Sequence, residues 1–156
     1  MMNQHEFRMR IALEEARVAQ SENEVPVGAV IIKDGLCIAK AHNQREALHD
    51  PTAHAEVLAL RMASQLLGRR QLSDCTLYVT LEPCPMCAGA IVMAELQACY
   101  FGAPDMRQGC CESICCIPQD PAFFHNVPCV GGVLETECKE LLHNFFKEKR
   151  KLSKEG

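Results

Sequence analysis

The amino-terminal part of the chain changes from a helical to a strand pattern of hydrophobic positions. From residue 4 to about residue 21, apolar residues recur near helical spacing, which predicts a helix. The β-rich run VPVGAVII (25–32) predicts a strand, and LCIAKA (36–41) predicts its return strand. Asp34 and Gly35 between the two runs are typical of a hairpin turn. The chain therefore begins with a helix followed by a β-hairpin.

The rest of the chain alternates helices with strands. The stretch HNQREALHDPTA (42–53) has turn chemistry and no clear period, which predicts a loop. The elements predicted after it are a helix over 54–67, a strand over 75–81, a helix over 86–96, a strand over 98–103, a short strand over 129–133 and a helix from residue 135. Such alternation indicates an α/β sandwich. Because no repeat, low-complexity tract or linker interrupts the pattern, we expect one domain over residues 1–156.

Composition places the chain among ordinary globular proteins. Its 156 residues, of which 48% are hydrophobic and 23% charged, are enough to bury a core. No stretch approaches the roughly 18 apolar residues of a membrane span, and MMNQHEFRMR is too polar for a signal peptide. We therefore expect a cytoplasmic protein without a membrane partner.

The eleven cysteines do not indicate a disulfide framework, because their number is odd and no export signal accompanies them. Four of them fall within RQGCCESICC (107–116), namely Cys110, Cys111, Cys115 and Cys116. Adjacent cysteines point in different directions, and the segment has no nearby histidine or CxxC pair. We expect these cysteines to be small buried thiols rather than a second metal site. Their role is left open.

Two short motifs carry the candidate chemistry, and each starts a predicted helix. PTAHAE (51–56) contains His54, and EPCPMC (82–87) contains Cys84 and Cys87. A CxxC pair alone is compatible with a redox centre or half of a zinc site. With the histidine it supplies three ligands, and a catalytic zinc site has three protein ligands and one position for water. A structural zinc site would need a fourth cysteine or histidine.

Glu56 lies two residues after His54 and fits a catalytic role beside that water. Zinc lowers the pKa of a bound water to about 7, and a neighbouring carboxylate can then move its proton. Taken alone, Glu56 would be an acidic residue in the first turn of a helix. Together the residues form the pattern H-x-E…P-C-x-x-C, which is typical of zinc-dependent nucleobase deaminases.

Longer motifs indicate one family among the zinc-dependent nucleobase deaminases. HDPTAHAE (49–56) and TLEPCPMCAGA (80–90) are specific, and EVPVGAV (24–30), YFGAPD (100–105) and NFFKEKRK (144–151) support them. On these motifs the chain resembles the bacterial tRNA-specific adenosine deaminases, which convert the wobble adenosine of an anticodon to inosine. The resemblance covers nearly the whole chain.

The resemblance implies a three-layer α/β/α sandwich with a mixed five-stranded sheet, similar to cytidine deaminases. It also implies a homodimer with active sites near the interface. One Zn²⁺ per chain would be held by His54, Cys84 and Cys87, with Glu56 as the proton shuttle. In the reaction, zinc-activated water attacks C6 of a flipped-out adenosine.

The resemblance further implies a tRNA anticodon stem-loop as partner. Asn43, which on its own would be an ordinary turn residue, corresponds to a residue that hydrogen-bonds the target nucleotide. Asp105 corresponds to an RNA-contacting loop aspartate, and Phe145, Phe146 and Lys147 belong to a segment resembling an RNA-contacting helix. The net charge of −4 does not exclude RNA, because a local basic patch suffices for phosphate contacts.

Other functions stay open at this stage. Pro104 stands where the family usually has a polar residue such as arginine, and CCESI (110–114) stands where it has small residues. These departures leave room for a deaminase of a free nucleobase such as guanine or cytosine. A non-catalytic zinc-binding partner would lack Glu56, and a metal-storage protein would bind well over one metal ion per chain.

Overall fold

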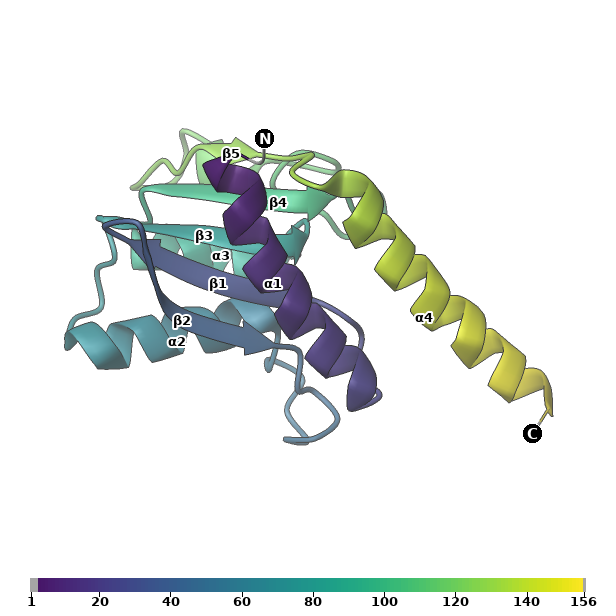
Figure 1. Ribbon diagram of the computed structural model, residues 1–156. Coiled ribbons are helices and arrows are strands. Elements are labelled where there is room, and N and C mark those ends of the chain that lie inside the picture. The colour runs from purple at the N-terminus through teal and green to yellow at the C-terminus, as the bar shows by residue number, and fades with distance from the viewer. Residues whose placement is uncertain (1–2, 156) are drawn as a thin grey trace.

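A mixed five-stranded sheet lies at the centre of the fold (Figure 1). The computed structural model describes residues 3–155. Its strands, in the order β2-β1-β3-β4-β5 across the sheet, are β1 Gly28–Lys33, β2 Leu36–His42, β3 Cys75–Leu81, β4 Ala98–Ala103 and β5 Cys129–Val130. Strand β1 is antiparallel to β2 and β3, whereas β3, β4 and β5 are mutually parallel. The predicted mixed sheet is therefore confirmed.

Helices cover both faces of this sheet (Figure 1). The helices are α1 Gln4–Ser21, α2 Ala55–Leu67, α3 Pro85–Ala94 and α4 Glu135–Glu155, with a short 3₁₀ helix η1 at Ile117–Gln119. On one face, Met9 and Leu13 of α1 and Cys138 of α4 pack against Val30 and Tyr78. The helices α2 and α3 cover the other face with small and branched apolar side chains. This is the predicted three-layer α/β/α sandwich.

Backbone conformation explains where several elements turn or end. Asp34 and Gly35 both have positive φ, as the tight turn between β1 and β2 requires. Glu95 also has positive φ and ends α3 at Ala94, two residues before the predicted end. At Gly28 a Cβ atom would overlap the carbonyl oxygen of Ala12, so glycine is what lets α1 lie this close to β1.

The segment between β4 and β5 is irregular, as the sequence indicated, apart from the unpredicted η1. Strand β5 is shorter than predicted, because only Cys129 and Val130 pair with β4. The chain then turns at Gly132 and Leu134, both of which have positive φ, before α4 begins. Among residues 3–155, no helix is both long and apolar enough to cross a membrane.

Candidate active site

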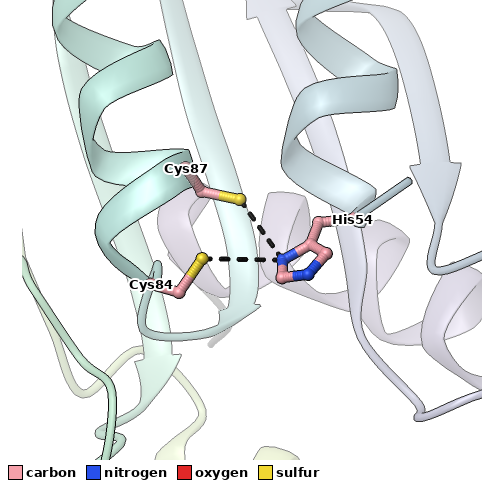
Figure 2. A group of neighbouring side chains, drawn as sticks. All are labelled: His54, Cys84 and Cys87. Carbon is pink, nitrogen blue, oxygen red and sulfur yellow. Dashed lines mark hydrogen bonds between the residues drawn. The ribbon is translucent and has the colours of Figure 1, made fainter. Parts of the chain in front are cut away.

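Two helix amino termini meet at the carboxyl end of β3 and bring three metal-ligating side chains together (Figure 2). His54 is the N-cap residue of α2, Cys84 is the N-cap residue of α3, and Cys87 lies in the first turn of α3. Neither His54 nor Cys84 uses its side chain to cap its own helix. The three side chains therefore point toward one another rather than along the helices.

The spacing of these side chains fits a tetrahedral zinc ion. The Nδ1 atom of His54 lies 3.6 Å from the Cys84 Sγ and 3.5 Å from the Cys87 Sγ. Zinc bonds of about 2.3 Å to sulfur and about 2.1 Å to nitrogen place tetrahedral ligands about 3.6 Å apart. The donor set, one imidazole and two thiols, is also one that zinc prefers.

The pKa values of the two thiols favour binding of a cation. A hydrogen bond from the Cys87 thiol, opposed by burial and assisted by His54, lowers the pKa of Cys84 to about 4. The same pairing with Cys84, together with burial, raises the pKa of the Cys87 thiol. One of the two sulfur atoms is therefore already a thiolate at neutral pH, and the positive ends of α2 and α3 favour that charge.

Glu56 is buried beside this group, with 4% of its surface exposed. Burial raises its pKa to about 7, although the nearby His54 opposes the shift. A carboxyl group that titrates near neutral pH can both accept and return a proton under working conditions. Its position and acidity therefore suit proton transfer in a reaction beside the three ligands.

A cavity of about 450 Å³ opens over Glu56 and the metal-ligating group. Its lining residues are Val25, Val27, Asn43, Arg45, His54, Glu56, Leu81, Glu82, Cys84, Pro104, Asp105, Met106, Arg107, Gln108, Leu142 and Phe146. Three of the predicted substrate contacts, Asn43, Asp105 and Phe146, line it together. The other two do not, because Phe145 turns into the protein interior and Lys147 is exposed further along α4.

Asn43 joins the loop before α2 to the helix itself. Its Oδ1 atom accepts a hydrogen bond of 2.8 Å from the backbone N–H of Ala55, and its own backbone N–H donates to the carbonyl of Val27. The oxygen of the amide is thereby occupied, and because Asn43 lines the cavity, its Nδ2 group is the part of the amide available as a donor there. The ordinary turn role and a substrate-binding role are thus compatible in this residue.

Asp105 also combines a structural contact with a place in the cavity wall. Its Oδ1 atom accepts hydrogen bonds from the backbone N–H groups of Arg107 and Gln108, which fixes the turn at residues 105–108. The same turn forms one wall of the cavity. Asp105 thus shapes the site through the loop as well as lining it.

Two buried acids that the sequence analysis did not single out hold the loops around the cavity. Glu82 accepts five hydrogen bonds, from the backbone N–H groups of Asp105, Cys111, Glu112 and Ser113 and from the Ser113 hydroxyl. Glu24 accepts two, from the N–H groups of Glu46 and Ala47. Both acids occur inside motifs used for the family resemblance, which was the available signal. The cationic lining residues Arg45 and Arg107 were also missed.

Comparisons with known proteins agree with this geometry. Residues 2–103 match the family model of the cytidine and deoxycytidylate deaminase zinc-binding region. The tRNA-specific adenosine deaminase of Bacillus subtilis (strain 168) is 46% identical over 153 residues, which cover 98% of this chain and 95% of the relative. The chain belongs to the tRNA-specific adenosine deaminase family. The predicted family is confirmed.

Solved structures of deaminases in this family share the fold. A structure from a study of A-to-I editing by tRNA:A34 deaminases at the wobble position superposes with a TM-score of 0.84 and 43% identity, over 87% of this chain and 99% of the other. A guanine deaminase from Bacillus subtilis superposes with a TM-score of 0.62 and 46% identity, over 66% of each chain. The likeness to the tRNA deaminase therefore extends over more of the chain.

Proposed function

We propose that this chain hydrolyses the wobble adenosine of a tRNA anticodon loop to inosine and ammonia. The observation that carries the proposal is one cavity lined by Glu56, by His54 and Cys84 of the metal-ligating group, and by Asn43, Asp105 and Phe146. Near full-length similarity to tRNA-specific adenosine deaminases supports the choice of substrate. Residues 1–156 would act as one deaminase domain.

One zinc ion per chain would be held by His54, Cys84 and Cys87. When bound there, zinc supplies a water molecule of lowered pKa as the nucleophile. Cys84 and Cys87 provide negative charge from the first turn of α3, and His54 provides Nδ1. His54 and Cys84 also line the cavity, so a substrate bound there would lie next to the ion that they would hold.

Glu56 would carry the protons. Its carboxylate takes a proton from the attacking water and delivers it to the ring nitrogen N1 of adenine, which makes C6 a better acceptor. Glu56 then takes the second proton from the hydroxyl group now on C6 and places it on the amino nitrogen, so that the C6–N bond breaks, ammonia leaves and C6 becomes a carbonyl. Burial raises the pKa of Glu56, which favours the return of each proton from the carboxyl group to the substrate.

Asn43 would donate from Nδ2 to the bound nucleoside and so fix its orientation. Phe146 at the rim offers an aromatic face for a neighbouring base, and Arg45 and Arg107 offer positive charge for the flanking phosphates.

Asp105 would contact the RNA from the loop after β4, with Lys147 on α4 adding charge outside the cavity. Phe145 would act indirectly, since it anchors α4 while Phe146 faces the rim.

Two further proposals concern the protein in the cell. We propose a homodimer, which is supported by large apolar side chains exposed on α2 and α3, namely Met62, Leu66, Met86 and Met93. Sedimentation analysis at several concentrations tests this directly. Because its substrate would be tRNA, we also propose that the chain acts in the cytoplasm.

Deamination of free guanine is the alternative that the comparison with guanine deaminase favours. The zinc-loaded protein should be offered an anticodon stem-loop with adenosine at the wobble position and, in parallel, guanine, cytosine, adenosine and cytidine. We expect inosine in the RNA, no ammonia from the small substrates, and no product with Glu56→Ala. Ammonia from a free base with unchanged RNA would overturn the substrate assignment and leave the zinc chemistry in place.

A further inference from the structure

A second group of three cysteines lies away from the catalytic ligands. Cys99 in β4, Cys111 in the loop after it and Cys129 in β5 place their sulfur atoms within 4.8 Å of one another. Residues 99 and 129 are direct partners in the parallel pairing of β4 and β5. The three cysteines are thus far apart in the sequence and adjacent in the fold.

Their surroundings favour a closed site. Cys99 and Cys111 are 0% and 2% exposed, whereas Cys129 is half-buried and so partly accessible from solvent. The backbone around them is fixed, because the Cys99 N–H donates to the carbonyl of Pro128 and the Cys111 N–H donates to Glu82. Fixed backbone around convergent ligands is what a metal site requires.

A fourth thiol lies next to the group. The Cys116 Sγ and the backbone N–H of Cys129 both contact the same side-chain oxygen of Gln119, at 3.6 Å and 3.2 Å. The Cys116 thiol is not one of the three that already converge, so it would join them through a change of its side-chain rotamer. The set of donors would then be four sulfur atoms, as in structural zinc sites.

We propose that Cys99, Cys111 and Cys129, completed by Cys116, bind a second zinc ion with a structural role. Tetrahedral zinc–thiolate bonds of about 2.3 Å place sulfur atoms about 3.8 Å apart, so the present group needs to close by about 1 Å at most. All-sulfur donors favour zinc over the hard cations, which take oxygen ligands.

The site would clamp the loop that forms a wall of the catalytic cavity. Residues 104–116 contain no helix or strand and are tied to the sheet chiefly through Glu82. A metal bridge from Cys111 to β4 and β5 would fix the far side of the same loop. Cys110 is not one of the three converging cysteines and contacts Cys115 instead.

The test is the zinc content of the full chain, purified with a phosphine reductant, loaded with Zn²⁺ and passed over a desalting column. We expect two zinc ions per chain in the wild type, one in Cys84→Ala/Cys87→Ala, and one in Cys111→Ala/Cys129→Ala. The matched controls Cys115→Ala, from the same loop, and Cys75→Ala, a buried cysteine outside the group, should keep two.

A second measurement covers the case in which a variant does not fold. Loading Cys84→Ala/Cys87→Ala with Co²⁺ should give thiolate-to-cobalt charge-transfer absorption, which disappears when Cys129→Ser is added. The proposal would be overturned if the wild type bound one zinc ion per chain and the three thiols of the group carried no metal. A mass two hydrogens lower from a disulfide within the reduced, zinc-loaded protein would overturn it as well.

Discussion

The side-chain oxygen of Asn43 accepts a hydrogen bond from the backbone N–H of Ala55 at 2.8 Å. This contact caps α2 from a different segment, because His54 at the N-cap position directs its imidazole to the two cysteines instead. The same residue therefore leaves the His54 imidazole available to the cysteine pair and also lines the cavity.

Asn43→Asp separates these two roles. Aspartate keeps the acceptor for the Ala55 N–H and is favourable at a helix amino terminus, so the free energy of unfolding should change by less than about 1 kcal/mol. It loses the amide donor, so kcat/KM on an anticodon stem-loop should fall by roughly tenfold or more. Denaturant unfolding and single-turnover kinetics measure the two effects. Unchanged kcat/KM would show that Asn43 only caps the helix.

Glu56→Gln should remove proton transfer and leave the metal site intact. The amide is similar in size to the carboxylate but cannot carry the proton, so the rate of deamination should fall by about 10²–10⁴-fold. Zinc content by elemental analysis should equal that of the wild type. A variant within tenfold of the wild-type rate would contradict the assignment of Glu56.

Glu82→Gln should loosen the loop over the cavity. Five hydrogen bonds converge on this buried carboxylate, and an amide can accept at only one atom, so we expect a loss of about 2–4 kcal/mol in the free energy of unfolding. Glu112→Gln, an exposed acid in the same loop, is the matched control and should cost less than about 0.5 kcal/mol. An equal loss in the free energy of unfolding for the two variants would contradict the role of Glu82 in holding the loop.

The effect of Glu82 should depend on pH in a defined direction. Burial opposes ionisation, but the hydrogen bonds from Ser113 and its neighbours outweigh it and lower the pKa of Glu82 below its ordinary value. A lowered pKa in the folded state gives stability that is present above the ordinary pKa of about 4.3 and is lost as the pH falls through the folded-state value. The stability difference between Glu82→Gln and wild type should therefore be constant near neutral pH and shrink in acid.

His42 should show the opposite pH dependence. Burial works against its protonation, but hydrogen bonds of 2.9 Å to Glu15 and to Glu22 prevail and raise the pKa of His42. A raised folded-state pKa gives stability that is full below the ordinary value and is lost as the pH rises through the folded-state value. His42→Asn should thus be more destabilising at about pH 5.5 than at about pH 8.5. The exposed His49→Asn is the control, and a pH-independent difference for His42→Asn would contradict this prediction.

Most of the fold follows from local patterns that the sequence displays. The hairpin is marked by Asp34 and Gly35, whose positive φ values are the conformation that this pair of residues favours. The predicted helices and strands agree with the structure to within a few residues, because each hydrophobic run keeps the period of the element that it forms. Element ends depend on single residues such as Glu95, for which the sequence carries no strong signal.

The candidate site was predictable only where its residues form short motifs. His54, Glu56, Cys84 and Cys87 could be proposed as site residues because they lie two or three positions apart within each motif. The roles of Glu82 and Glu24 could not be found in this way, since both acids bind backbone N–H groups of loops more than twenty residues away. Phe145 and Phe146 are adjacent in sequence, and only the packing of α4 decides that Phe146 faces the cavity.

The grouping of Cys99, Cys111 and Cys129 could not be predicted from short motifs either. Within RQGCCESICC alone, the spacing of the cysteines is unfavourable for a metal site. Cys111 instead meets partners from β4 and β5, which the strand pairing of the sheet brings to it. Distances across a parallel sheet are set by register, which local sequence does not encode.

Position-specific deamination of RNA tests the central claim most directly. Two anticodon stem-loops would differ only in whether the single loop adenosine lies at the wobble position or at the neighbouring position, and inosine would be located by mass spectrometry after digestion. We expect inosine only in the first RNA, and none with Glu56→Gln. Equal conversion of both RNAs, or conversion of neither by zinc-loaded protein, would contradict it.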